Sequence, residues 1–508
     1  MIRTSKHKLG NVLFVIPYVL LIVLASICVR SQYLWNDESF TFQIIKHSYS
    51  QIVHLTALDV HPFMYYFIAK FFSGFTSSLF GKIAILRLVS VAPFLLMLLF
   101  ETFYLKKFFS SKTIIWSMFA TVCAPLLVGN IYQVRMYGWA SLFVFLLFSV
   151  VVRYIQTGKF TKSYAISTSM FSLLAAYSHY YGLIAAGILN AVLFTLILIN
   201  NRTFLRRIFF SIAVDICLYF PWLFVLFKQT KTVSGNYWTP KMSIPYFVSL
   251  LSNSFRPFPS RWGSILALVL LLSIAILLFI AFTRFHNGYM IEASSLLAVA
   301  VLGISFPFIA LVLGSCASLL LGHTVIIVRY LCIFILPFWF SVSILVGLRP
   351  IKVWSYLASF AMVLIFSISF VHTAGTLFSY GQQFHNTLKI YRKIPKNATV
   401  VFDNSVVMYS SASYISKVAV LSGRSNDVLF HVYKRVFKNI RQVQPNRVHS
   451  LSNQLYFVQS GTKAKKGLQI YQSRYSAYVS KKFKATKIDN IFLPLDGGKS
   501  TLYRLTVK

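Results

Sequence analysis

The feature that most constrains the fold is a series of apolar runs, each about 20 residues long. A run of this length can cross the hydrocarbon core of a bilayer as a single helix. Eleven such runs precede residue 373, at 12–29, 84–104, 113–130, 137–156, 164–180, 182–200, 208–227, 263–283, 292–317, 328–348 and 353–372. The pattern predicts a polytopic α-helical membrane protein with about 11 transmembrane helices.

Charge narrows the class of protein and predicts its orientation. The chain is 57% hydrophobic, yet it has 49 Lys and Arg against 10 Asp and Glu, a net charge of +39. So apolar a chain is neither disordered nor a soluble nucleic-acid-binding protein. With eleven spans, the basic loops and the basic N-terminus fall on one side, which the positive-inside rule makes cytoplasmic. The chain after residue 372 is then predicted outside the cell membrane.

One further apolar segment, residues 61–78, is predicted not to cross the membrane. It holds Lys70 near its middle, and a lysine is costly in lipid. A crossing here would also move every later basic loop to the outside. We expect the segment to lie at the outer interface, among interfacial helices of an external loop, 31–83. An arrangement of 11–13 spans, with a second compensating crossing, stays open.

Composition changes after the last apolar run. Residues 373–508 contain 22 Lys and Arg against 4 Asp, a net charge of +18. Short apolar runs such as 398–402 and 454–458 alternate with turn residues, which is typical of a small α/β domain. We therefore predict two domains: a transmembrane domain, 1–372, and a basic extracytoplasmic α/β domain, 373–508.

The scarce carboxylates gather in the predicted external loop. Asp37 and Glu38 are adjacent, and Asp59 follows close to His61. Simpler explanations exist, because Asp37 can cap a helix and the residues after Asp59 can begin one. A carboxylate near a hydroxyl can also act as a general base. The carboxylate oxygens and the imidazole nitrogen of these four side chains can also bind a divalent cation. The loop is a candidate active site, with metal binding uncertain.

Two motifs in this loop resemble those of known enzymes. Trp35-Asn-Asp-Glu-Ser39, followed by Asp59-Val-His-Pro-Phe-Met-Tyr-Tyr66, resembles the first external loop of the GT-C glycosyltransferases. The similarity is greatest to the protein O-mannosyltransferase and bacterial family 39 branch, which includes the aminoarabinose transferases. Phe63 stands where that branch usually has a second proline. Weaker matches follow in the expected order: Ile85-Leu-Arg87-Leu, Gln133-Val-Arg-Met-Tyr137, Tyr177-Ser-His-Tyr-Tyr-Gly182 and Val328-Arg-Tyr-Leu331.

The resemblance implies a GT-C fold and a function. It implies transfer of a sugar, with inversion, from a polyprenyl-phosphate donor to an acceptor on the outer face of the membrane. Asp37 is the expected general base and Glu38 its catalytic neighbour, while Asp59 and His61 would orient or hold the acceptor. Arginines would bind the donor phosphate. The expected phosphate ligands are Arg87, Arg135 and Arg329, and the expected pocket lining is Tyr137, His179, Tyr180 and Tyr330.

The partners expected from this function are a polyprenyl-phosphate-linked sugar, membrane lipid, and an envelope glycan, lipid or protein as acceptor. No nucleic-acid partner and no certain cofactor are expected, although a divalent cation stays open. The small C-terminal domain and the lack of external cysteines favour a bacterial cell membrane. Other functions also fit a polytopic basic chain: a transporter or flippase of lipid-linked sugars, a membrane protein that binds envelope polymers, and an O-antigen polymerase or ligase.

Overall fold

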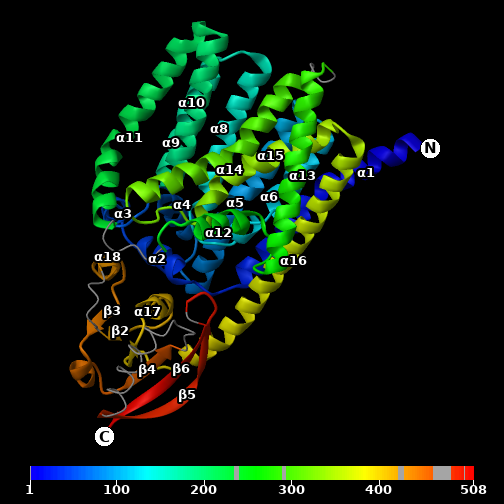
Figure 1. Cartoon of the computed structure of the whole chain (residues 1–508). Coiled ribbons are helices and arrows are strands. Elements are labelled where there is room, and N and C mark those ends of the chain that lie inside the picture. The colour runs from blue at the N-terminus through cyan, green and yellow to red at the C-terminus, as the bar shows by residue number, and fades with distance from the viewer. Residues whose placement is uncertain (1, 234–239, 289–292, 422–427, 461–481, 497) are drawn as a thin grey trace. The chain divides into compact units, whose positions relative to one another are not determined.

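The computed structural model describes the chain except residues 1, 234–239, 289–292, 422–427, 461–481 and 497 (Figure 1). The chain forms two compact units. The first, which we call the helical unit, contains Met1–Ser26, Val60–Tyr65 and Arg87–Ala374. The second, which we call the sheet unit, contains Ile27–Asp59, Tyr66–Leu86 and Gly375–Lys508.

Among the described residues, nine helices are long and apolar enough to cross a membrane. They are α1 (Ile2–Arg30), α5 (Leu79–Phe103), α8 (Tyr137–Thr157), α10 (Tyr180–Asn200), α11 (Leu205–Val233), α13 (Arg261–His286), α14 (Ser294–Leu320), α15 (Cys332–Leu348) and α16 (Lys352–Arg392). The other two predicted spans coincide with shorter helices. These are α6 (Ser111–Cys123), of 13 residues, and α9 (Lys162–Ser178), of 17 residues. The chain is a multi-pass membrane protein, as predicted.

The core of the helical unit lies around α15. This helix is apolar on all sides and is buried along almost its whole length, which is the pattern of a helix surrounded by other helices. It packs against α6, α8 and α14 (Figure 1). Gly303 on α14 permits a close approach, since an added Cβ would lie 2.5 Å from the carbonyl oxygen of Pro337.

The segment predicted to lie at the interface forms α4 (Met64–Ser73), a helix of 10 residues. At a rise of 1.5 Å per residue it is about 15 Å long, half of what a crossing needs. Lys70 Nζ donates to the carbonyl oxygen of Ile45 at 3.2 Å, so its charge has a polar partner. Three aromatic side chains near the end of the helix are exposed: Phe71, Phe72 and Phe75. The prediction that this segment is not a full span is confirmed, and its place at the interface stays a prediction.

The sheet unit contains a six-stranded mixed sheet with strand order β3-β2-β1-β4-β6-β5. The strands are β1 (Thr399–Phe402), β2 (Val418–Leu421), β3 (Ile440–Val443), β4 (Leu455–Ser460), β5 (Phe483–Leu493) and β6 (Gly498–Val507). The first four pair in parallel, and β6 is antiparallel to both β4 and β5. Every residue of β1 and β2 is buried, as expected of parallel strands covered on both faces. The predicted small α/β domain is confirmed, and the runs 398–402 and 454–458 form β1 and β4.

Helices from the two ends of the chain pack together in the sheet unit. They are α2 (Asn36–Ile44), α3 (Tyr49–Leu58), α17 (Ser405–Ser411) and α18 (Val428–Val436). The helix α2 contacts α17 and α18, and α3 contacts α18. The rings of Phe40 and Tyr433 lie 5.1 Å apart. The acidic loop is therefore part of the same compact unit as the C-terminal sheet.

The last predicted span lies within a longer helix. The predicted span 353–372 forms the first half of α16, a single helix of 41 residues that continues to Arg392. Residues 373–392 are too polar to count as a span but contain no proline, so the helix continues until the approach to Pro395. The remaining short elements are α7 (Val128–Ile131), α12 (Ile244–Phe255), η1 (Leu105–Lys107), η2 (Arg202–Phe204), η4 (Val328–Leu331) and η5 (Pro445–Ser450).

Candidate active site

The predicted site residues divide between the two units. The carboxylates Asp37, Glu38 and Asp59 belong to the sheet unit. The basic and aromatic residues belong to the helical unit: His61, Arg87, Arg135, Tyr137, His179, Tyr180, Arg329 and Tyr330.

The Asp-Glu pair occupies the first turn of α2. Asp37 is half-buried and Glu38 is 1% exposed. Glu38 Oε2 accepts from the backbone N–H of Trp35, the N-cap residue, at 3.4 Å. Negative charge at a helix N-terminus is stabilised by the helix dipole and by N–H groups that lack partners within the helix. Glu38 is therefore turned back onto the helix start, and Asp37 is the more accessible of the two carboxylates.

Asp59 ends the next helix. It is the C-cap residue of α3 with an extended backbone, and its N–H donates to the carbonyl oxygen of Thr56 at 3.1 Å. The side chain is buried, with 7% of its surface exposed. An extended residue here, followed by Pro62, stops α3 before α4 begins.

His179 lies at the junction of two helices in the helical unit. It follows the last residue of α9 and precedes the first of α10, with an extended backbone (φ −160°, ψ 145°). Its Nδ1 accepts from the N–H of Tyr181 at 3.0 Å, which assigns the proton of the neutral ring to Nε2. The N–H of Gly182 donates to the His179 carbonyl oxygen at 2.8 Å. The helix junction thus fixes both the position and the tautomer of this ring.

His61 lies beside His179, with ring centroids 5.4 Å apart. Burial, followed by the charges of Arg135 and Arg329, lowers the pKa of His179 to about 3. Burial and the same two arginines, with a contribution from His179, also hold the pKa of His61 well below its ordinary value. Both rings are therefore neutral at pH 7, in a positive potential. Among the described residues, His61 Nδ1 and His179 Nε2 are buried without a hydrogen-bond partner.

Tyrosine rings complete this group. Tyr330 lies 4.9 Å from the His179 ring, and Tyr137 lies 5.5 Å from it. Tyr181, which the sequence did not single out, lies 5.0 Å from Tyr330. We name the basic-aromatic cluster by its members: His61, Arg135, Tyr137, His179, Tyr181, Arg329 and Tyr330.

Tyr180 points elsewhere. Its hydroxyl donates to Gln229 Oε1 and accepts from Trp222 Nε1 at 3.2 Å, both on α11. Tyr181 contributes its ring to the cluster, and the place of Tyr180 in the pocket lining stays a prediction. Adjacent residues on a helix face different directions, so the motif alone could not separate them.

Arg87 supports the segment that carries Arg135. Arg87 is 2% exposed, and its Nη1 donates to the carbonyl oxygen of Tyr132 at 2.6 Å. Tyr132 stands three residues before Arg135, in the short connection between α7 and α8. The bond holds this connection against α5.

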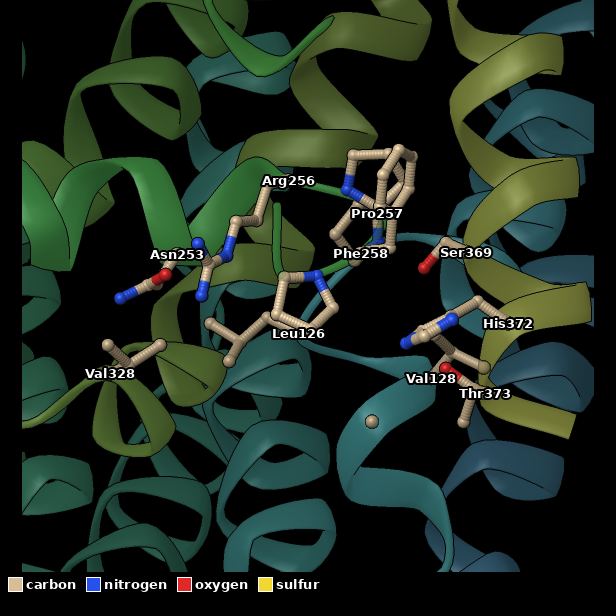
Figure 2. Close-up of a pocket in the computed structure, with 13 residues that line it drawn as sticks. Leu126, Val128, Asn253, Arg256, Pro257, Phe258, Val328, Ser369, His372 and Thr373 are labelled. Carbon is tan, nitrogen blue, oxygen red and sulfur yellow. The ribbon is translucent and has the colours of Figure 1, made fainter. Parts of the chain in front are cut away.

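The helical unit also contains a cavity of about 360 Å³ (Figure 2). Polar side chains reach it from separate elements, with Asn253 and Arg256 at the end of α12 and His372 on α16. Val328 also lines it, and the next residue in η4 is Arg329 of the cluster. Sequence reasoning missed this cavity, because no motif joins its widely separated residues.

Metal binding was left open by the sequence. Within the described ranges, no group of three His, Cys, Asp or Glu side chains is arranged to hold a metal ion. A metal site formed by Asp37, Glu38, Asp59 and His61 stays a prediction.

Neither a protein-family model nor a curated protein matches the chain. Among solved structures, it is similar to ArnT from Cupriavidus metallidurans in the apo state, with 10% identity, 98% of each chain covered and a TM-score of 0.61. It is also similar to that ArnT bound to undecaprenyl phosphate, with 11% identity, 97% of each chain covered and a TM-score of 0.59. The chain has the fold of ArnT over nearly its whole length, which confirms the GT-C fold predicted from the motifs.

Proposed function

We propose that this protein is an integral-membrane glycosyltransferase that moves a sugar from a polyprenyl-phosphate donor to an acceptor at the outer face of the membrane. The observation that carries the proposal is the basic-aromatic cluster, in which Arg135 and Arg329 act on two buried neutral histidines. A similar fold in ArnT binds undecaprenyl phosphate. Together they favour a lipid-linked phosphate as the ligand of the cluster.

The cluster has the groups that a departing phosphate needs. As the bond between the sugar and the phosphate breaks, negative charge develops on the phosphate oxygens. Arg135 and Arg329 can stabilise this charge through charge-assisted hydrogen bonds, and His179 can donate from Nε2 without carrying charge itself. Arg87 contributes by holding the segment of Arg135. Arg87 stays a candidate phosphate ligand, since its bond to the Tyr132 carbonyl oxygen uses only Nη1.

Asp37 and Glu38 are the groups proposed to activate the acceptor hydroxyl. The acceptor hydroxyl gives its proton to Asp37 while its oxygen forms a bond to the anomeric carbon, and the polyprenyl phosphate leaves with the electron pair of the broken bond. Such a single displacement inverts the anomeric centre. Glu38 fixes the start of α2 through the N–H of Trp35. Asp59 and His61 are the candidates for orienting the acceptor.

The proposed setting is a bacterial cell membrane, with a cytoplasmic N-terminus and with residues 373–508 outside. We assign catalysis to the predicted transmembrane domain, 1–372; its carboxylates Asp37, Glu38 and Asp59 belong to the same compact unit as the C-terminal sheet. The acceptor is then an envelope glycan, lipid or protein, and the donor is a polyprenyl-phosphate-linked sugar drawn from the membrane.

The test compares lipid-linked sugars and envelope glycans by mass spectrometry in cells with and without the gene. Deletion should remove one glycan modification and cause its lipid-linked precursor to accumulate. Wild-type protein should restore the modification, and Asp37→Asn should not. Asp489→Asn, which changes an exposed carboxylate of β5 in the same way, is the matched control and should restore it.

Two results would count against the proposal. If deletion changes no envelope glycan or lipid-linked sugar, the protein is not this kind of transferase. If Asp37→Asn restores the modification at wild-type membrane abundance, a transferase is present but Asp37 is not its base.

A further inference from the structure

A buried carboxylate in the sheet unit has no part in the scheme above. Asp496 lies in the turn between β5 and β6, where an aspartate is usually exposed, yet only 5% of its surface is exposed. Burial raises the pKa of Asp496 to about 6, against hydrogen bonds from Ser410, Tyr33 and Asn36 that lower it. At neutral pH the side chain is ionised, and a buried charge is tolerated only with good partners.

Those partners converge on one oxygen of Asp496. Oδ2 accepts from the Tyr33 hydroxyl at 2.6 Å, from Ser410 Oγ at 2.6 Å and from the backbone N–H of Asn36 at 3.0 Å. The Tyr33 hydroxyl also accepts from the N–H of Leu495 at 3.3 Å, which ties the same turn down a second time. All of these residues belong to the sheet unit.

The N-terminus of α2 requires such a partner. Its first N–H groups have no acceptor within the helix, and the usual solution is an oxygen on the N-cap side chain. Here the N-cap residue is Trp35, whose indole can only donate. Asp496 supplies the missing acceptor to Asn36, the first residue of α2. Asn36 is directly followed by Asp37 and Glu38.

The link between Asp496 and the acidic pair is also electrostatic. The charge of Asp37 is close enough to raise the pKa of Asp496 further. Burial and the charge of Asp496 raise the pKa of Tyr33 well above its ordinary value, and the charge of Glu38 raises it further. The carboxylate in the turn and the pair on α2 therefore form one network of charges.

We propose that Asp496 is a positioning residue for the proposed catalytic pair, holding the first turn of α2 so that the Asp37 carboxylate points toward the acceptor hydroxyl. The inference rests on the proposed function. Asp496 touches no substrate in this scheme, and it acts through the backbone of Asn36. An isosteric amide at this position keeps the shape of the side chain but loses the negative charge that attracts the Asn36 N–H.

The first measurement is structural and uses the full chain in lipid nanodiscs. Hydrogen exchange of peptides covering residues 34–44 should be faster in Asp496→Asn than in wild type, by about ten-fold or more, since a hydrogen bond to a charged group contributes about 1.5–3 kcal/mol. Asp489→Asn removes an exposed carboxylate from the same hairpin and should leave the exchange of α2 unchanged. Equal exchange in wild type and Asp496→Asn overturns the inference.

The second measurement separates positioning from general damage. In cells, Asp496→Asn should lower glycan modification by about ten- to a hundred-fold, the usual effect of a small displacement of a catalytic group. Binding of undecaprenyl phosphate to the purified variant should match wild type, because the proposed phosphate ligands belong to the helical unit. Wild-type modification by Asp496→Asn, or loss of both modification and lipid binding, contradicts a positioning role.

A milder variant tests the inference if Asp496→Asn does not accumulate in the membrane. Tyr33→Phe removes one of the three donors to Oδ2 and keeps the bond from Asn36, so it should give a smaller increase in exchange and a smaller loss of modification. No change in either quantity refutes the inference. If wild-type protein itself modifies no glycan, the proposed function fails; if only the Asp37→Asn prediction holds, the function stands and the positioning role falls.

Discussion

The junction that carries His179 can be disturbed by one methyl group. A Cβ added at Gly182 would lie 2.2 Å from the carbonyl oxygen of Ala175, whereas ordinary contacts begin at 3.4 Å. The start of α10 and the end of α9 must therefore separate by about 1 Å in Gly182→Ala. The same Ala175 oxygen accepts from the His179 N–H at 3.1 Å, so the displacement reaches the histidine directly.

The expected change in the stability of Gly182→Ala is the sum of three contributions. Overpacking costs about 1–3 kcal/mol and loss of the His179–Ala175 hydrogen bond costs about 1 kcal/mol. Alanine stabilises the helix by about 1 kcal/mol relative to glycine because of its higher helix propensity. The net expectation is a loss of about 1–3 kcal/mol in stability. Because a shift of 1 Å can reduce a rate by about a hundred-fold, glycan modification should fall more steeply than stability.

The matched control lies on the same helix. Gly187 has no atom within 4 Å of an added Cβ, so Gly187→Ala should be as stable as wild type or more so. The assay is the thermal unfolding midpoint in detergent together with envelope glycan analysis in cells. If Gly182→Ala matches Gly187→Ala in both, the contact with Ala175 does not constrain the junction and the reasoning is refuted.

Three further measurements test the charges and the topology. Arg329→Gln should weaken binding of undecaprenyl phosphate by about ten- to a hundred-fold, and an unchanged affinity would remove Arg329 from the phosphate site. Because burial raises the pKa of Asp496 from 3.8 to about 6, the folded protein binds this proton more tightly than the unfolded chain. The contribution of Asp496 to the free energy of unfolding should therefore fall as pH rises from about 4 to about 6. Asp496→Asn should lose this part of the slope of the unfolding midpoint against pH; an identical slope would contradict the shift. Cysteines introduced at the exposed positions Lys46 and Lys112 should react with an impermeant reagent from opposite sides of the membrane, and labelling of both from outside would reject the eleven-span topology.

Nine of the eleven predicted spans coincide with described helices long enough to cross a membrane, because each depends on local composition. An apolar run long enough to cross a bilayer leaves a helix as almost the only way to satisfy its backbone, so the sequence alone locates it. The end of a helix is harder to predict from composition than the position of a span. The polar half of α16, residues 373–392, continues the helix with no signal in hydropathy.

The site was only partly predictable, since its residues meet through long-range packing. Motifs pointed to His61 and His179 separately, but only the fold brings their rings to 5.4 Å. The contact of Tyr181 with Tyr330 depends on the direction in which each side chain leaves α10, which the motif does not contain. The contact between Asp496 and α2 had no signal at all, because a turn aspartate before glycines predicts a turn wherever the turn packs.

The packing of α2 against the C-terminal sheet also bears on biosynthesis. Asn36 and Asp496 are 460 residues apart in the chain. At roughly 5–20 residues per second, the ribosome reaches the second roughly 20–90 s after the first. The early helices have time to enter the membrane during this interval, while the first turn of α2 still lacks its acceptor. A nascent or truncated chain can thus insert its spans before Asp37, the proposed general base, is held in place. The last hairpin to emerge would act as the final step of maturation, and incomplete copies would remain inactive in the membrane.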